Sequence, residues 1–217
     1  MTALPSSAGP AEVFSRFDVS RESQVRLQAY VTLLERWQAR INLVGPETMA
    51  RVWQRHVADG LQLIRFIGAN PRTLIDIGSG GGIPGLVLAL AYPQLRVVLV
   101  ESNQKKAAFL REASRPVAER VFVIPRRLEK IDSEPYRMAA PIVTARAVAH
   151  LKDLLDLTEP LLRWGIGLFY KGQTVDDELT DSADYWRIRF VKHRSIVEPR
   201  GSILEILEAR RSHDDSG

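Results

Sequence analysis

The feature that most constrains this chain is a glycine-rich loop after an apolar, strand-like run, in the stretch LIDIGSGGGIPGLVLALAY from Leu74 to Tyr92. Five glycines fall within eight residues, from Gly78 to Gly85. Glycine has no Cβ and accepts positive φ angles, so this loop lets the backbone come close to a ligand. The ligands to be considered are a dinucleotide, a nucleoside triphosphate and a molecule without phosphate.

The rest of the chain after this loop alternates between short apolar runs and helical stretches. Expected strands are 73–77, 96–100, 121–124, 142–145 and 166–170, and expected helices are 84–91, 103–115 and 150–163. This alternation predicts a parallel sheet covered on both faces, a doubly wound α/β fold. Two late runs, 186–192 and 203–208, are close enough in sequence to form a hairpin, which predicts an antiparallel edge.

The first part of the chain has a helical pattern instead. Ser20 can cap a helix, and Leu27, Val31 and Leu34 recur at helical spacing. The predicted organisation is therefore a disordered N-terminus, a helical extension packed on the core, the α/β domain and a disordered tail, with the bounds 1–9, 10–70, 71–209 and 210–217.

Composition limits the chemistry that the chain can perform. The 217 residues include no cysteine, which excludes disulfides, thiolate metal sites and thiol nucleophiles. The four histidines do not complete a metal-ligand spacing, so no metal is expected. The start MTALPSSAGP lacks a signal peptide's pattern, and no apolar run reaches the roughly 18 residues of a membrane helix. These features predict a cytoplasmic protein without a membrane partner.

Two phosphate ligands fit the loop poorly. A Walker loop needs Gly-Lys followed by Ser or Thr, and this sequence has none. The dinucleotide pattern is matched literally by the glycines at 80, 82 and 85. However, Asp76 ends the strand at the loop entrance, where its charge would repel a pyrophosphate.

Asp76 suits a cationic ligand instead. S-adenosylmethionine carries an ammonium and a sulfonium but no phosphate, and an aspartate offers its amino-acid end a charge-assisted hydrogen bond or a water-mediated one. Glu101 closes the second strand, where a carboxylate can accept both ribose hydroxyls of an adenosine. The predicted cofactor is therefore S-adenosylmethionine, with Asp76, Gly80 and Glu101 in contact with it.

Several further motifs accompany the loop, namely INLVGPETMARVWQRHVADGLQL, ESNQKKAAFL, RRLE, TARAVAHL and YKG. With them the chain resembles the bacterial 16S ribosomal RNA 7-methylguanosine methyltransferases of the RsmG/GidB type from about Arg36 to Gly172. The resemblance implies a class I S-adenosylmethionine-dependent methyltransferase with an N-terminal helical extension. It also implies that the chain methylates ring nitrogen 7 of a guanine, with 16S rRNA or the small ribosomal subunit as partner. We expect the protein to be a monomer.

The resemblance also assigns site residues. It places Gly78 and Ile83 in the cofactor pocket, Glu101 on the ribose, Leu128 and Glu129 beside the adenine, and Arg146 near the methyl donor. Lys171, at the end of the fifth strand, also faces the site in this fold. Because ring nitrogen 7 of guanine has a lone pair and no proton, Arg146 and Lys171 are expected to act by positioning rather than as bases.

Some alternatives remain open. A ribose 2′-hydroxyl methyltransferase would use Lys171 as a base, an assembly factor would keep the fold without catalysis, and a nicotinamide oxidoreductase would share the glycine pattern. His56 and Asp59 lie on one helical face and favour a structural pairing over substrate contact. Asn42 is compatible with a buried tie or with an RNA contact. The basic face of WRIRFVKHR fits RNA phosphates or a solvated edge strand.

Overall fold

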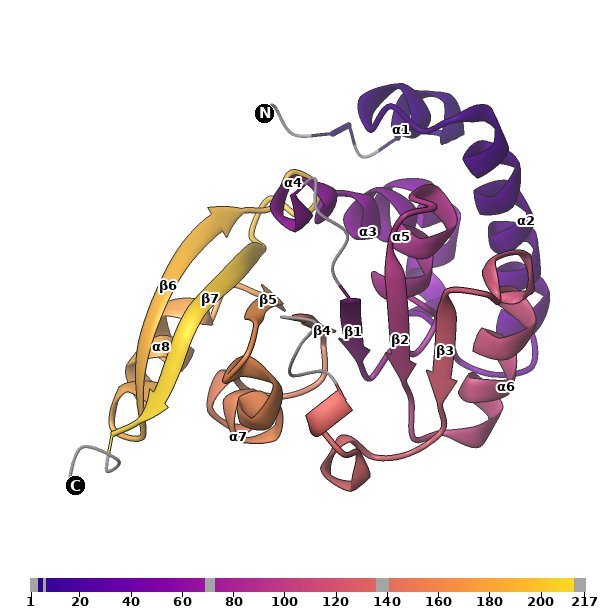
Figure 1. The fold of residues 1–217 in the computed structure, drawn as a ribbon. Coiled ribbons are helices and arrows are strands. Elements are labelled where there is room, and N and C mark those ends of the chain that lie inside the picture. Colours follow the sequence, from indigo (N-terminus) through magenta and orange to yellow (C-terminus); the bar gives the residue numbers. More distant parts are fainter. Residues whose placement is uncertain (1–3, 6, 69–72, 136–140, 213–217) are drawn as a thin grey trace.

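The computed structural model describes residues 4–5, 7–68, 73–135 and 141–212, and Figure 1 shows their arrangement. Within these residues, seven strands form one sheet in the order β3-β2-β1-β4-β5-β7-β6. The strands are β1 Thr73–Ile77, β2 Arg96–Val100, β3 Val121–Ile124, β4 Ile142–Arg146, β5 Ile166–Lys171, β6 Trp186–Arg194 and β7 Ser202–Arg211. The first five pair in parallel, and β7 runs antiparallel to both β5 and β6. The predicted doubly wound sheet with an antiparallel edge is confirmed.

Two apolar cores lie on opposite faces of the sheet. One packs the sheet against α1 Pro10–Arg16, α2 Arg21–Gln38, α5 Gly85–Ala91 and α6 Gln104–Ala113. The other packs it against α7 Leu151–Leu162 and α8 Val175–Ala183. Helices therefore cover both faces, as Figure 1 shows, and the N-terminal helices share a continuous core with the sheet.

The long N-terminal helix α2 packs directly on the helix that follows the glycine loop. Ser20 caps α2 by accepting a hydrogen bond from the Ser23 amide, as its position predicts. The Ser23 hydroxyl donates to the Ala91 carbonyl at 2.8 Å, and Arg26 Nε donates to the Leu90 carbonyl at 3.1 Å. Because both acceptors are at the carboxyl end of α5, these bonds satisfy carbonyls that lack partners within that helix.

Within the predicted helical extension, the segment from Pro46 to Ile67 is not one regular helix. It consists of a 3-10 helix η1 Pro46–Arg51, a π-helix η2 Trp53–Ala58 and two short helices, α3 Asp59–Leu61 and α4 Ile64–Ile67. Single π turns are rare and occur frequently at functional sites. Here the π turn carries Arg55 and His56, whose partners are described below.

The chain after β5 departs from the prediction in three ways. Helix α8 was not expected, because its sequence VDDELTDSA has few apolar residues. The pairing of β6 with β7 shifts between Arg189 and Phe190, so the alternation of apolar and basic positions along β6 is interrupted and Phe190 is 40 % exposed. Strand β7 continues to Arg211 and thus enters the predicted tail, because Arg210 and Arg211 pair with the start of β6. The rest of that tail, 213–217, and residues 1–3 and 6 lie outside the described residues, as does the predicted boundary at 70–71.

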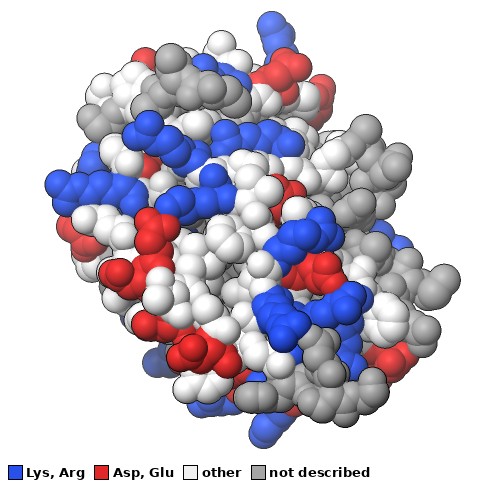
Figure 2. Space-filling view, turned by 90° about the vertical axis from the view of Figure 1, so that its left-hand side faces the viewer, with Lys and Arg blue, Asp and Glu red and all other residues white. Residues whose placement is uncertain are grey.

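The β6 edge of the molecule carries charges of both signs. Figure 2 shows basic and acidic side chains in separate groups on this face rather than one basic surface. On β6, Arg189 pairs with Glu208 and Lys192 pairs with Asp176. This pairing is typical of a charged, solvated edge strand.

Two short 3-10 helices flank β3, namely η3 Arg115–Val117 and η4 Leu128–Lys130. Helix η4 follows β3 at the carboxyl edge of the sheet, so it lies at the edge where β1, β2 and β4 also end.

Candidate active site

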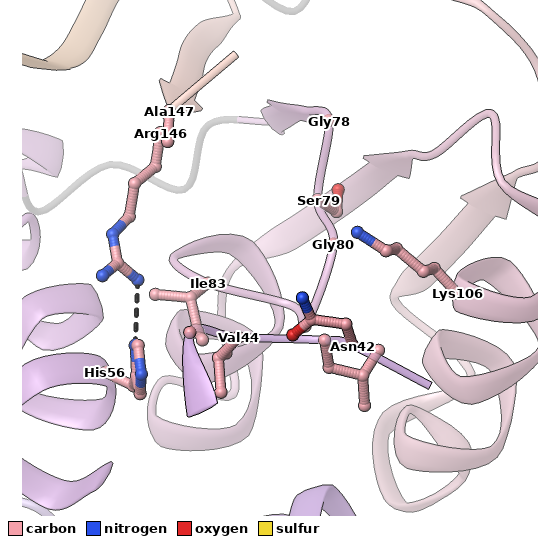
Figure 3. A pocket seen from close by; sticks show the side chains of 13 residues that line it. Asn42, Val44, His56, Gly78, Ser79, Gly80, Ile83, Lys106, Arg146 and Ala147 are labelled. Carbon is pink, nitrogen blue, oxygen red and sulfur yellow. Dashed lines mark hydrogen bonds between the residues drawn. The ribbon is translucent and has the colours of Figure 1, made fainter. Parts of the chain in front are cut away.

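The glycine loop borders a cavity of about 340 Å³ at the carboxyl ends of β1 and β4. Its wall combines the loop, the segment between α2 and η1, and side chains from η2, α6 and β4. Figure 3 shows Arg146 and Lys106 reaching toward it from opposite sides. The residues that line it are Asn42, Leu43, Val44, Gly45, His56, Gly78, Ser79, Gly80, Gly81, Ile83, Lys106, Arg146 and Ala147.

The loop keeps its open shape through glycine conformations and backbone contacts. Gly78 and Gly80 have φ angles of 65° and 54°, in the left-handed region that other residues rarely adopt. A Cβ on Gly78 would also lie 2.9 Å from a methyl of Val148. The Tyr30 hydroxyl, on α2, donates to the Gly81 carbonyl at 2.6 Å. The N-terminal helix therefore holds the loop from outside the α/β domain.

Glu101 sits at the end of β2 as predicted, and the protein backbone holds its carboxylate. Oε2 accepts a hydrogen bond from the Gly80 amide at 2.9 Å, and Oε1 accepts one from the Asn103 amide at 2.8 Å. A carboxylate has about four acceptor sites, so each oxygen keeps capacity for a further donor. The side chain is buried, with 7 % exposure. A pair of ribose hydroxyls fits this held, partly used carboxylate.

Asp76, predicted to contact the cofactor by a direct or a water-mediated hydrogen bond, lies behind the cavity wall rather than on it. Its side chain is fully buried, and Oδ2 accepts from the Gly85 amide at 3.2 Å at the start of α5. A Cβ on Gly85 would lie 2.7 Å from the Asp76 Cβ, so the helix packs against the strand there. Burial raises the pKa of Asp76 to about 7, against hydrogen bonds from Gly85 and Ser79 that lower it. The geometry thus makes Asp76 a support of the loop.

Arg146, at the end of β4, is held by three groups from the helical extension. Its Nε lies 3.0 Å from Asp59 Oδ2, and its Nη2 donates to the Arg55 carbonyl at 3.2 Å. Its Nη1 lies 3.2 Å from His56 Nδ1, the contact drawn in Figure 3. His56 and Asp59, for which a structural pairing is predicted, are joined through Arg146. Both side chains bind this one arginine and fix it at the cavity wall.

The hydrogen-bond order around His56 defines its protonation state. The Thr48 hydroxyl donates to the Gly45 carbonyl at 2.6 Å, so it accepts from His56 Nε2, 2.6 Å away. His56 Nδ1 is then left with a lone pair that accepts from Arg146. Burial, with the charges of Arg146 and Arg55, lowers the pKa of His56 to about 3. His56 is therefore a neutral imidazole whose Nε2 hydrogen and Nδ1 lone pair are both engaged in hydrogen bonds.

Lys171 is occupied by a buried ion pair. Its Nζ lies 2.7 Å from Glu178 Oε2 and donates to the Ala149 carbonyl at 3.0 Å. The same Glu178 oxygen accepts from the Leu151 amide at 2.8 Å. Burial favours the neutral form of Glu178, but the hydrogen bond and charge of Lys171 outweigh it and hold the pKa of Glu178 below its usual range. Lys171 thus fixes the loop between β4 and α7, and Glu178, on the unpredicted α8, is a partner that sequence reasoning missed.

The predicted adenine contacts lie around a smaller cavity on the other side of Gly78. This space, of about 140 Å³, is bordered by Leu128 and Glu129 of η4, together with Val100 and Val148. Since Gly78 lines both spaces, the two are adjacent. A ligand with an adenosine part and an amino-acid part can lie across Gly78, near Gly80, whose amide donates to Glu101.

Two features of the cavity wall were not predicted from the sequence: the hydrogen bonds of Gln38 to the segment before η1, and the part played by Lys106. The amide oxygen of Gln38 accepts from the Leu43 and Val44 amides at 2.9 and 3.1 Å, which fixes the segment before η1 against the cavity. In that segment Asn42 is exposed and borders the cavity, so it is not a buried tie. Lys106 enters from α6 and was visible in the sequence as part of QKKAAFL, without a role. Its ammonium fits the carboxylate end of an amino acid.

Among the residues that the structure describes, no group of three or more His, Cys, Asp or Glu side chains is placed to hold a metal ion. None of the helices described is long and apolar enough to cross a membrane.

Comparison with solved structures agrees with this fold. The cofactor-bound protein Rv0187 from MTB aligns with a TM-score of 0.57 and 18% identity, over 92% of this chain and 98% of that chain. An S-adenosylmethionine-dependent methyltransferase from Aquifex aeolicus aligns with a TM-score of 0.55 and 13% identity, over 82% and 98%. The sheet order, the glycine loop and these likenesses thus define the fold of the class I S-adenosylmethionine-dependent methyltransferases.

Sequence comparison identifies the family within that class. The family model for rRNA small subunit methyltransferase G matches residues 23–206. A ribosomal RNA small subunit methyltransferase G from Paramagnetospirillum magneticum is 44% identical over 94% of this chain and 97% of that protein. One from Rhodopseudomonas palustris is 48% identical over 87% and 82%. The chain belongs to the family of rRNA small subunit methyltransferase G, and the predicted family resemblance is confirmed.

Proposed function

We propose that this protein transfers a methyl group from S-adenosylmethionine to ring nitrogen 7 of a guanine in small-subunit ribosomal RNA. The family and its relatives carry the name of a small-subunit rRNA methyltransferase. The site supports the choice of atom, because ring nitrogen 7 of guanine is an acceptor with no proton to remove.

The residues around the two adjacent cavities fit the cofactor. Glu101 has acceptor capacity for the ribose hydroxyls, and Leu128 and Glu129 border the space for the adenine. Lys106 lines the glycine-loop cavity, where its ammonium suits the carboxylate of the cofactor's amino-acid part. When bound, S-adenosylmethionine supplies an activated methyl group on a sulfonium. The chain's own task is to align the acceptor with that methyl and to exclude water.

The observation that carries the proposal is the lack of freedom of the two candidate bases. Lys171 is paired with Glu178, and the lone pair of His56 already accepts from Arg146. A ribose 2′-hydroxyl acceptor would need a base to remove its proton. Guanine nitrogen 7 needs none, so a site in which Lys171 and His56 are committed to structural bonds favours it.

Arg146 is the proposed positioning residue at the methyl-transfer point. It lines the glycine-loop cavity from the end of β4, where it is held by His56, Asp59 and the Arg55 carbonyl. A guanidinium carries N–H groups beyond those three bonds, and these can donate to the guanine oxygen or to an RNA phosphate.

We further propose that the protein acts as a monomer in the cytoplasm, with the small ribosomal subunit or its 16S rRNA as partner. One copy of the chain contains the cavities and all the residues that hold Arg146. Arginine outnumbers lysine by 24 to 6 in the sequence, and its planar guanidinium suits phosphate recognition.

Methyl transfer to defined substrates tests this function. Radiolabelled S-adenosylmethionine is incubated with the protein and either unmodified small subunits or naked 16S rRNA, and the labelled nucleoside is identified after digestion. We expect 7-methylguanosine from at least one of the two substrates. Labelled 2′-O-methyl nucleosides, or binding of the subunit without label transfer, would support the alternative enzyme or a non-catalytic assembly factor.

A further inference from the structure

Another cavity lies beside the glycine-loop cavity, on the side of β5 and β7, and is distinct from the smaller space near Leu128. The glycine-loop cavity is here called the first cavity and this one the second. The second cavity measures about 200 Å³ and shares Arg146 and Ala147 with the glycine-loop cavity, so the two adjoin at the end of β4. Its remaining wall comes from η2, the end of β5 and the turn between β6 and β7. A group placed in this cavity would face a methyl donor in the first one across Arg146.

The β6–β7 turn that closes this cavity is anchored at several points. The Ser195 hydroxyl accepts from the Val197 and Glu198 amides at 3.1 and 2.9 Å. From the helical extension, Gln54 donates to the Val197 carbonyl at 3.0 Å, and Gln62 accepts from the Ile196 amide at 3.1 Å. The turn is therefore held in place before any substrate arrives.

Glu198 is the acidic group that this turn presents to the cavity. Its side chain is 40 % exposed and forms an ion pair with Arg55 of η2. The Arg55 side chain is 24 % exposed, and its buried Nε has no hydrogen-bond partner among the residues described. Carboxylate and guanidinium thus stand together, accessible and fixed, with hydrogen-bonding capacity left over.

We infer that this second cavity receives the acceptor guanine and that Glu198 binds its Watson–Crick edge. The inference rests on the function proposed above. Guanine presents the N1 hydrogen and the 2-amino group side by side, and a carboxylate can accept both in two charge-assisted bonds. Ring nitrogen 7 is on the other ring of the purine, which is then free to face Arg146 and the first cavity.

The same arrangement excludes adenine. Adenine has a lone pair at N1 and no 2-amino group, so its edge would place an acceptor against the Glu198 carboxylate. Such a mismatch sets two acceptors against each other, and it rejects the wrong base more strongly than a shape difference does. Arg55 can donate to guanine O6, an acceptor that adenine lacks. Glu198 and Arg55 would therefore set specificity, while Arg146 sets position.

The variant Glu198→Gln tests this inference, with Glu208→Gln as a matched control. Both changes replace a glutamate of the β6–β7 hairpin that pairs with arginine, but Glu208 faces Arg189 and Arg210 at the far end of the hairpin. Glu198→Gln should lower kcat/KM on unmodified small subunits by about 10- to 100-fold. Its Kd for S-adenosylmethionine, measured by calorimetry, should stay within about twofold of wild type. The control should match wild type in both.

A change in the substrate separates recognition from a structural effect. Small subunits are reconstituted with inosine, which lacks the 2-amino group, at the target position. Wild type and Glu208→Gln should methylate the inosine subunits about tenfold less efficiently, while Glu198→Gln should treat both substrates alike, because the two deletions remove one contact. If Glu198→Gln keeps the wild-type preference for guanine, the inference is wrong. A wild-type protein that forms no 7-methylguanosine would refute the proposed function and this inference with it.

Discussion

At the scale of single residues, the proposed methyl transfer depends on Arg146 being held in one orientation. Three bonds to Asp59, His56 and the Arg55 carbonyl fix its guanidinium. Lysine keeps the charge but cannot reach three acceptors with a planar fork. Arg146→Lys should therefore lower the single-turnover rate of methyl transfer by about 10²-fold, since a misplacement of about 1 Å can cost that much.

His56→Ala provides the finer test of the same arrangement. It removes one of the three bonds to Arg146, so it should lower the single-turnover rate by about tenfold. Arg189→Lys, on the β6 edge, is the matched control and should leave the rate unchanged. Equal rates for His56→Ala and wild type would mean that the histidine does not position Arg146.

Asp76 leads to a prediction about stability and pH. Its pKa is about 7 in the folded protein, against 3.8 for an unperturbed aspartate. Between these values the folded protein holds a proton that the unfolded chain has lost, so this residue makes the free energy of unfolding fall as pH rises from about 4 to about 7. Asp76→Asn keeps an oxygen for the Gly85 amide and cannot ionise.

The free energy of unfolding of Asp76→Asn, relative to that of wild type, should therefore rise by roughly 2–3 kcal/mol between pH 5 and pH 8. Denaturant unfolding of both proteins at the two pH values measures it. His56, whose pKa is lowered, changes stability in the opposite direction at acid pH, but it does so equally in both proteins. A difference that stays constant with pH would show that Asp76 is ionised throughout.

At the scale of elements, α8 and β5 together fix the loop after β4. Breaking a buried ion pair by removing one partner typically costs about 3–5 kcal/mol, whereas replacing both partners with apolar residues is often neutral. Lys171→Met should therefore destabilise the protein by that amount, and Lys171→Met with Glu178→Leu should regain most of it. Thermal unfolding measures both. If the double variant is no more stable than the single one, the pair is not the source of the loss.

The elements also show what the sequence could predict. The strands β1 to β5 follow from short apolar β-rich runs, and the glycine loop with Glu101 follows from local pattern. Helix α8 was missed because its exposed acidic face hides its few apolar positions, and the π turn at Trp53–Ala58 has no periodic signal. The bonds to Arg146 were missed because they join residues about 90 apart in the chain, and only the fold brings these together.

At the scale of the whole molecule, the helical extension is part of the active site. It supplies Tyr30 to the glycine loop, Gln38 to the cavity wall, and Asp59 and His56 to Arg146. It also shares one apolar core with the sheet. The site is therefore assembled from both parts of the chain, and its proposed task is to align a guanine with the methyl donor without a base.

The pH dependence of the chemical step shows whether methyl transfer needs a base. Unmodified small subunits, saturating S-adenosylmethionine and excess protein are mixed and quenched at pH values from 6 to 9, and the methylated nucleoside is identified at each. We expect 7-methylguanosine throughout, with a rate constant that changes less than about twofold, since no essential base titrates in this range. A rate that rises about tenfold per pH unit, with 2′-O-methyl product, would contradict this expectation.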